Sequence, residues 1–299
     1  MKLKSLAPLF YVLPLLVVLV AVLIYPLADM AYQGALPQQE EGLGAAVAGG
    51  EAAATKAGWR SITYRNYVAV FTDPFLRSTL QLSLTLAVVV SLLSIVLCMG
   101  PAWLLVRKQF RGKRAFRVIL TLPMAFSGII IGFLAVIMIG RIGFVPEVTR
   151  WLFGVPVGQG LAYGVIGLSL AYIWFQIPRA TLTLESAIRK FDWDLESAAR
   201  GLGASPWQAF RYVLLPLLMP AIVSTIAVTF AVSMGSFGVA LLLLKKASVL
   251  PLEIYNQVYA NLAFEMAAAM SVVLAVITVG VNYTLRRYGE RNYVYAHAD

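Results

Sequence analysis

Residues that commonly carry out chemistry are scarce in this chain. The sequence has one Cys, Cys98, and one His, His297, so neither an internal disulfide nor a His/Cys metal site can form within it. A membrane enzyme would need titratable groups that converge on one point. The only dense group of acids alternates with basic residues, as on a solvated helix: Glu185, Asp192, Asp194 and Glu196. The sequence therefore predicts no catalytic residue and no metal site.

The sequence also lacks a recognisable nucleotide-binding motif. No G-x-x-x-x-G-K-[ST] sequence occurs, so the chain has no P-loop to hold phosphates. The stretch Gly201–Pro206 (GLGASP) has the first two glycines of a G-x-G-x-x-G loop, but the final Gly is missing and no strand precedes it. We predict that the chain is not an enzyme, that it holds no cofactor of its own, and that any ATP hydrolysis takes place in another polypeptide.

One polar segment, Leu195 to Pro216 (LESAARGLGASPWQAFRYVLLP), interrupts the apolar sequence. Asp192 or Asp194 can cap a helix here, and Gly203 stands where a residue in the left-handed conformation would end it. The apolar face of this helix consists of Leu195, Ala198, Ala199 and Leu202. The following Ser205-Pro206-Trp207-Gln208 is a capping-box sequence that begins a second helix. The segment therefore predicts a helix, a tight turn and a helix.

The first of these two helices has only about nine residues, too few to be stable alone in water. It needs a surface to pack on, and its small Ala residues allow close approach. Spacing alone leaves two surfaces open: the protein's own helix bundle and a partner protein.

The elements around this segment are predicted to cross a membrane. The chain is 60% hydrophobic and 13% charged, with a mean hydropathy of +0.81. Runs long enough to span a bilayer, about 20 residues each, recur along its length. They predict an all-α, polytopic membrane protein with six transmembrane helices, the first an uncleaved anchor: Leu9–Ala28, Thr79–Leu105, Val118–Gly140, Leu161–Leu184, Leu217–Leu244 and Met266–Leu285.

The net charge of +10 fits this topology. Basic residues gather at the ends of apolar runs, so they indicate membrane orientation and not a nucleic-acid partner. With the N-terminus inside, 16 of the 24 Lys and Arg residues face the cytoplasm. Both termini are therefore predicted to be cytoplasmic, in a multi-pass protein of the bilayer.

The chain divides into four predicted parts. Residues 1–30 are a cytoplasmic tail and the first span, 31–75 an outer loop, 76–290 a five-helix core that contains the polar loop 185–216, and 291–299 a cytoplasmic tail. Within the outer loop, Tyr32–Thr55 is rich in Ala and Gly and reads as a linker or, alternatively, as a docking surface. Trp59–Phe75 is predicted to form a short interfacial helix.

The centres of the predicted spans contain no Asp, Glu, Lys or Arg. A proton- or sodium-coupled carrier usually has an intramembrane ionisable residue, so the pattern favours a conduit powered from outside the membrane. Candidates for its lining are Ser127, Tyr172, Gln176, Ser233, Gly235 and Ser236. Helix packing is the simpler alternative for each, because Gly and Ser let helix backbones approach.

The polar segment resembles the cytoplasmic loop of permease subunits in binding-protein-dependent ATP-binding-cassette (ABC) importers. That loop has the pattern E-A-A, three residues, Gly, nine residues, Ile, one residue, Leu-Pro. This sequence has Ser197-Ala198-Ala199, then Gly203, then Val213-Leu214-Leu215-Pro216 at the same spacing. Ser197 replaces the Glu and Val213 the Ile, and Glu196 is a possible source of the missing carboxylate.

The resemblance extends over nearly the whole chain, including Asn66–Ala87, and implies a type I importer permease fold in a bacterial inner membrane. It implies two ATPase subunits that bind ATP and Mg, a second permease subunit and a periplasmic binding protein. The residues implied to couple to the ATPase are Asp194, Leu195, Glu196, Ser197, Ala198, Ala199, Leu202, Gly203, Ala204, Ser205 and Pro206. Those implied to contact the binding protein are Glu253, Tyr255, Asn256 and Gln257.

The overall likeness is greatest to the spermidine/putrescine permeases, with iron(III), thiamine and aminoethylphosphonate systems nearby. A polyamine or related small charged solute is therefore the expected cargo. The alternatives are an ion-coupled secondary transporter, a passive channel and a membrane-embedded enzyme.

Overall fold

The computed structural model describes residues 24–36 and 64–295 of the chain. Helices contain most of these residues, and no strand occurs among them. An apolar chain in lipid must satisfy its backbone hydrogen bonds internally, and a helix does so within one segment. The predicted all-α class is confirmed.

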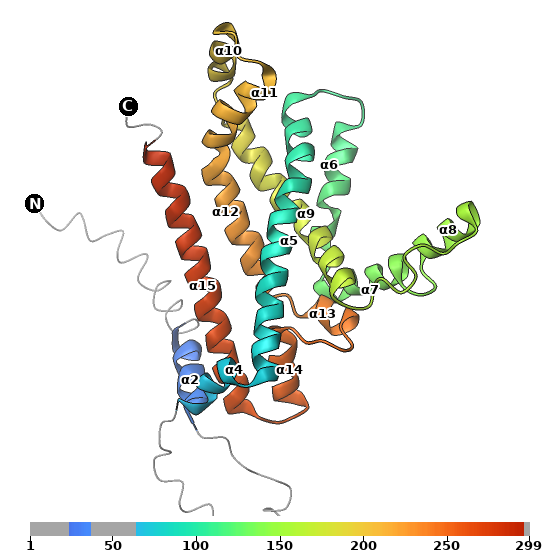
Figure 1. Cartoon of the computed structure of the whole chain (residues 1–299), viewed down its shortest axis with the longest axis vertical. Helices are drawn as coiled ribbons and strands as arrows, with labels where there is room; N and C mark the ends of the chain where they lie inside the picture. Colours follow the sequence, from blue (N-terminus) through green and yellow to red (C-terminus); the bar gives the residue numbers. More distant parts are fainter. Residues whose placement is uncertain (1–23, 37–63, 296–299) are drawn as a thin grey trace, which may run out of the picture. The chain divides into compact units, whose positions relative to one another are not determined.

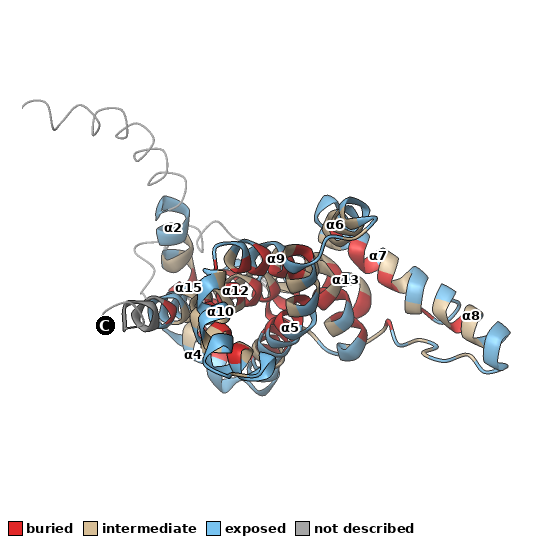
Figure 2. Cartoon of the chain, turned by 90° about the horizontal axis from the view of Figure 1, so that it is seen from above, coloured by how far each residue is buried: buried red, intermediate tan, exposed pale blue. Residues whose placement is uncertain are grey.

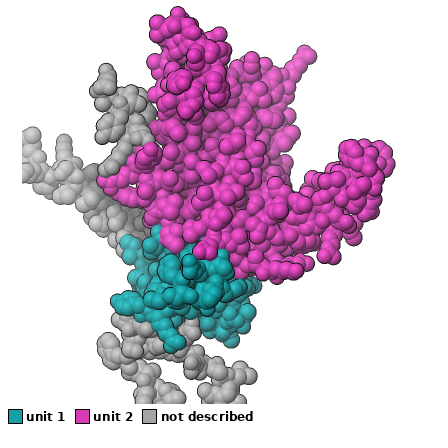
Figure 3. Space-filling view, in the orientation of Figure 1, with its two compact units in different colours: residues 1–80, 253–276 teal, residues 81–252, 277–299 magenta. Residues whose placement is uncertain are grey.

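The chain forms two compact units (Figure 3). One unit contains residues 1–80 and 253–276, and the other contains residues 81–252 and 277–299. The second unit contains the polar segment 195–216, so it positions the candidate site.

The described part of the first unit includes α2 (Tyr25–Gly34) and α4 (Arg65–Thr72). The buried Asn66 donates from Nδ2 to the carbonyl oxygens of Gly34 (3.1 Å) and Leu36 (2.7 Å). It thereby satisfies free carbonyls at the end of α2. α4 is the helix expected within Trp59–Phe75. The first predicted span and the linker Tyr32–Thr55 lie almost entirely outside the described residues.

The second unit is a bundle of long apolar helices (Figure 1). By length and composition, five segments of the described residues could cross a membrane: Pro74–Arg107, Gly128–Phe153, Val165–Arg189, Pro206–Met234 and Phe264–Gly289. They include α5 (Pro74–Arg107), α9 (Val165–Arg189), α12 (Leu215–Met234) and α15 (Phe264–Tyr295). The five segments overlap the second to sixth predicted spans, and residues 74–80 of α5 and 264–276 of α15 belong to the first unit.

Two clusters of buried side chains hold this bundle together. One includes Leu86, Ile131, Leu168 and Leu243, and the other includes Cys98, Leu184, Ile188, Leu214 and Leu218. Buried residues lie where helices face one another, and exposed residues lie on their outer sides (Figure 2). Many of the outer residues are apolar, such as Val96 and Phe133, as expected for helices that face lipid tails.

Two predicted spans are not single helices. Val118–Gly140 is divided into α6 (Lys113–Thr121), a 3-10 turn (Leu122–Ala125) and α7 (Gly128–Ile139). Pro123 lies at this break, where its ring and missing N–H disfavour a continuous α-helix. A single helix over this stretch was therefore a wrong prediction.

The predicted span Leu217–Leu244 is divided as well. α12 ends at Met234, and α13 (Gly238–Leu243) follows after a short break. A Cβ atom at Gly238 would lie 2.8 Å from the Ile129 side chain and 2.9 Å from its backbone nitrogen. The break thus lets the start of α13 pack directly on the start of α7.

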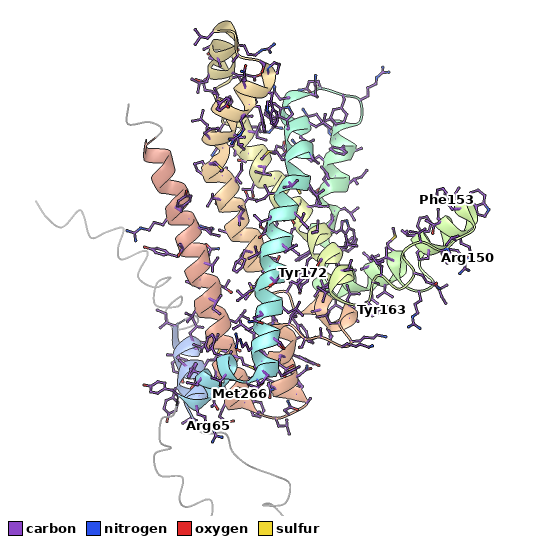
Figure 4. All side chains as sticks on the ribbon, in the orientation of Figure 1. Arg65, Arg150, Phe153, Tyr163, Tyr172 and Met266 are labelled. Atoms are coloured by element: carbon purple, nitrogen blue, oxygen red, sulfur yellow. The ribbon has the colours of Figure 1, made fainter. Side chains whose placement is uncertain are left out.

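Between α7 and α9 the structure has a helix that the sequence pattern did not predict, α8 (Phe144–Phe153). It extends away from the bundle, with Arg150 and Phe153 near its end (Figure 4). Arg150 pairs with Glu147 at 3.5 Å, and the Thr149 hydroxyl accepts a hydrogen bond from Val157 N at 2.9 Å. Trp151 remains 84% exposed, so α8 presents a large apolar residue outside the bundle.

Candidate functional site

The polar segment folds as its sequence predicts. α10 (Trp193–Gly201) begins at Asp192, whose Oδ1 accepts a hydrogen bond from Asp194 N at 3.0 Å. Of the two acids considered, Asp192 is therefore the cap, and Asp194 lies in the first turn. Both carboxylates are at the positive end of the helix dipole, where negative charge is favourable.

Gly203 ends α10 in the left-handed conformation, with φ of +93°. Gly203 N donates to Arg200 O at 3.0 Å, and Ala204 N donates to Ala199 O at 3.1 Å. This pair of bonds is the Schellman motif, which satisfies the free carbonyls of a helix end. The predicted tight turn is confirmed. The positive φ explains why a Gly stands at position 203, because a residue without a Cβ atom adopts this conformation at little cost.

The second helix begins with the predicted capping box. Gln208 Oε1 accepts from Ser205 N at 2.7 Å, and Gln208 N donates to Ser205 Oγ at 3.3 Å. α11 (Pro206–Ala209) continues through a π-helical turn (Phe210–Leu214) into α12. Pro216 follows this turn, and its ring disfavours regular α geometry around the preceding carbonyls. We call residues 193–209, α10 and α11 with their turn, the coupling segment.

The apolar face of the coupling segment is turned away from the bundle. Leu202 is 91% exposed, Trp207 69% and Leu195 45%. Ala198 is also exposed, whereas Ala199 is half-buried. The sequence left two surfaces open for this face: the protein's own bundle and a partner protein. In the described part of the chain, the bundle does not cover Leu202 or Leu195.

The opposite face of α10 is fixed to the end of α5. Arg107 Nη2 lies 2.8 Å from Glu196 Oε2, and the Arg107 guanidinium carbon lies 4.2 Å from the centre of the Trp193 ring. Trp103, one turn before Arg107, packs edge-on against Trp193 with 5.6 Å between ring centroids. A cation over an aromatic face and a carboxylate together hold α10 in a defined orientation.

This contact bears on the expectation that Glu196 replaces the missing carboxylate. It also adds Trp103 and Arg107 to the residues of the candidate site. The Glu196 side chain is only 17% exposed and is paired within its own chain, so it does not replace the missing outward carboxylate at Ser197. Trp103 and Arg107 were not predicted. The sequence signal for them was their i, i+4 spacing at the end of a span, which places both on one helix face. This spacing does not specify Glu196, 89 residues away, as the partner of Arg107.

A second ionic contact lies beside the segment. The Glu185 side chain is 5% exposed, and its Oε1 accepts from Arg189 Nη2 at 2.7 Å and from Arg117 Nη2 of α6. Glu185, Glu196 and Asp192 therefore each have a separate structural partner. Among the described residues, no group of three or more His, Cys, Asp or Glu could hold a metal ion.

Four of the predicted path residues meet where α9 and α12 pack together. Gln176 is 1% exposed, and its Nε2 donates to Thr229 O at 2.8 Å and Ser233 Oγ at 3.0 Å. The Tyr172 hydroxyl donates to Ser236 O. In Figure 4, Tyr172 lies within the bundle. These contacts agree with the packing alternative, and a role in lining the path stays a prediction.

The other two path candidates are Gly235 and Ser127. Gly235 is exposed and follows the last residue of α12. Ser127 precedes α7 in extended conformation, and its side chain makes no capping hydrogen bond. Hydrogen bonds thus join Gln176 to Ser233 and Tyr172 to Ser236. Ser127 adjoins Gly128, where a Cβ atom would lie 3.8 Å from Gly238 Cα.

The residues expected to contact a binding protein lie on α14 (Leu250–Tyr259). Glu253 is buried, and its carboxylate accepts from Gln257 Nε2 at 2.9 Å and from Asn256 Nδ2 at 3.3 Å. Tyr255 is 38% exposed. Tyr255 is thus the most accessible of the four, while Glu253 faces its own chain.

Comparison with known proteins identifies this arrangement. The family described as binding-protein-dependent transport system inner membrane component matches residues 94–290. The molybdenum transport permease protein ModB of Haemophilus influenzae is 31% identical over 209 residues, 68% of this chain and 90% of the relative. The sulfate transport permease protein CysW of Synechocystis is 30% identical over 217 residues, 71% of this chain and 76% of the relative.

Solved structures show the same fold. A bacterial alginate ABC transporter chain, crystallised with an alginate-bound periplasmic protein, superposes with a TM-score of 0.75 at 18% identity, covering 98% of this chain and 97% of that one. An inward-facing MetNI methionine transporter chain gives 0.56 at 19% identity, covering 73% and 95%. The chain thus belongs to the binding-protein-dependent transport inner membrane components, the multi-pass permease subunits of ABC importers.

Proposed function

We propose that this permease subunit forms one half of a translocation path and is moved by separate ATPase subunits that bind the coupling segment. The observation that carries this proposal is Leu202, which is 91% exposed at the end of a helix whose two termini are both fully capped. A rigid, correctly terminated helix with an uncovered Leu is suited to insertion into a groove of a partner.

The connections of the coupling segment explain how a movement there would reach the membrane. α9 leads into α10, α11 continues into α12, and α10 is joined to α5 through Arg107 and Glu196. A displacement of the segment is therefore transmitted to three long helices at once. Rigid-body rocking of packed helices, driven by a partner that binds two states differently, then opens the path on alternate sides.

The proposal assigns the remaining components to other chains. ATP and Mg are bound by two ATPase subunits, a second permease completes the path, and a periplasmic protein delivers cargo to the outer side. Tyr255 and Asn256 of α14 are proposed contacts for that protein, with both chain termini in the cytoplasm. Gln176 and Ser233 are proposed to act at the path when α9 and α12 move apart.

For cargo, we propose a small tetrahedral oxyanion. Relatives at or above 30% identity that align with two thirds or more of the chain include permeases of molybdenum and sulfate transport. Molybdenum in neutral water is the molybdate dianion, which has the shape and charge of sulfate. The polyamine expectation has no support among these relatives, because polyamines are extended cations. Cargo choice resides mainly in the binding protein, so the permease sequence alone constrains it weakly.

Reconstitution tests the proposal. The chain is co-expressed with a candidate ATPase, second permease and binding protein, purified, and placed in liposomes that contain ATP. We expect a stable complex and uptake of molybdate or sulfate that needs both ATP and the binding protein, with no uptake of spermidine.

Three results would contradict parts of this assignment. Failure of the ATPase to co-purify would remove the importer mechanism. Uptake without ATP would indicate a channel, and uptake driven by an ion gradient would indicate a secondary transporter. Uptake of spermidine alone would restore the polyamine cargo.

A further inference from the structure

A cleft of about 400 Å³ opens beside the coupling segment, between the end of α5 and α10 with α11. Its apolar lining includes Trp103 and Phe210, whose rings pack edge-on at 6.1 Å. Its charged lining consists of Arg107, Lys108, Glu196 and Arg200. The cleft therefore combines an aromatic wall with a predominantly basic rim.

The charges of the cleft do not cancel. Glu196 neutralises Arg107 through their 2.8 Å ion pair. Neither Lys108 nor Arg200 has a carboxylate within ion-pair distance in the described part of the chain, although both are exposed. Two exposed positive charges thus remain at the rim of the cleft beside its aromatic wall, where they attract an anion in a salt-dependent way.

The backbone that carries Lys108 is well defined. Lys108 O accepts a hydrogen bond from Lys113 Nζ at 3.1 Å, across a tight turn in which Gly112 has a φ of +88°. Arg200 lies in the last turn of α10, which the Schellman motif fixes. Lys108 directly follows α5, where its N donates to Leu104 O at 3.1 Å, and Arg200 lies within α10, so the backbone of each cation is anchored at a helix end.

We infer that this cleft accepts a carboxylate side chain of the ATPase subunit, held between Lys108 and Arg200 next to the Trp103 ring. This inference rests on the proposed function and adds a second, electrostatic contact to the apolar contact at Leu202. An ATPase is favoured over a lipid headgroup because α10 and α11 extend beyond the end of α5 (Figure 1), on the side that a partner of the coupling segment would approach. The same helices build both contacts.

The test is a charge reversal in the complete complex. The double variant Lys108→Glu/Arg200→Glu and the matched control Arg111→Glu/Arg114→Glu change the net charge equally, and all four residues are exposed. The control residues do not line the cleft. Each chain is placed in nanodiscs of neutral lipid, and its affinity for the purified ATPase subunit is measured from 50 to 500 mM NaCl. These variants alter only exposed side chains, and gel filtration confirms that each one is folded.

We expect the cleft variant to bind the ATPase at least tenfold more weakly at about 50 mM salt, with little further dependence on salt, because screening acts on the attraction that was removed. The control should lose less than threefold. The neutral variant Lys108→Gln/Arg200→Gln should lie between the two.

Equal affinity of the wild type and the cleft variant would overturn the inference, as would an equal loss in the control. Loss of co-purified phosphatidylglycerol, measured by mass spectrometry, without a change in ATPase affinity would assign the cleft to a lipid headgroup instead. If the wild-type chain itself does not bind the ATPase, the proposed function fails, which is a different result from failure of the cleft alone.

Discussion

In the coupling segment, local caps satisfy the helix ends while a large apolar side chain, Leu202, remains exposed. Between α9 and α12 the arrangement is reversed, because Gln176 and Ser233 are buried and bonded across the interface. In the first region the caps and the turn close their hydrogen bonds between residues 192 and 208, and the apolar surface is free for another protein. The second depends on contacts between helices, so its polar groups stabilise the fold of this chain.

This contrast predicts that substitutions in the two regions affect different properties of the protein. Changes on the exposed face of the coupling segment should alter binding to the ATPase and leave the fold intact. Changes at the α9–α12 interface should alter the stability of the bundle and leave ATPase binding intact. Three substitutions test this difference.

The largest effect is expected for Leu202→Asp. A charge on a Leu that is 91% exposed does not disturb the chain itself, but it cannot be buried in an apolar groove without cost. We expect the affinity for the ATPase to fall about 30-fold, equivalent to about 2 kcal/mol, with an unchanged thermal midpoint. Surface-immobilised binding measurements check this, with Leu202→Met as the matched control. An unchanged affinity would show that the groove contacts another face of α10.

A smaller effect is expected for Gly203→Ala. A Cβ atom at Gly203 would meet nothing within 4 Å, so only the φ of +93° opposes the substitution. The left-handed conformation costs a non-glycine residue about 1–2 kcal/mol. We expect faster hydrogen exchange of the 193–209 amides and fewer cargo molecules imported per ATP hydrolysed.

Gly201→Ala is the control for this substitution. A Cβ at Gly201 also meets nothing within 4 Å, but Gly201 has no positive φ. It should slow exchange in α10 or leave it unchanged, because Ala favours a helix over Gly. Equal exchange rates in the two variants would mean that the turn geometry does not matter for the segment.

The smallest effect is expected for Gln176→Leu. It removes hydrogen bonds to Thr229 O and Ser233 Oγ inside the bundle, and such interhelical bonds in membranes contribute about 0.6–2 kcal/mol. The thermal midpoint of the purified chain should fall by a few degrees while ATPase affinity stays within twofold. Ser169→Ala, at a half-buried position of the same helix, removes only a bond to Val165 O within that helix and should change neither. A strong loss of ATPase affinity in Gln176→Leu would break the contrast between the regions.

The sequence alone determined the features that depend on neighbouring residues. An Asp cap at Asp192 or Asp194, the Gly203 turn and the Ser205–Gln208 capping box were all predictable, because each closes its hydrogen bonds within a few residues. The long apolar runs likewise determined the membrane helices and the all-α class, since the backbone in lipid has few alternatives.

Only the tertiary structure decided which groups far apart in the chain meet. The pairing of Arg107 with Glu196, the packing of Gly238 on α7 and the bonds of Gln176 to α12 join residues 53 to 110 positions apart. Sequence spacing within one helix specifies which face a side chain occupies, but not which other helix covers that face. Whether Leu202 would be buried or exposed was therefore settled by the packing of the bundle.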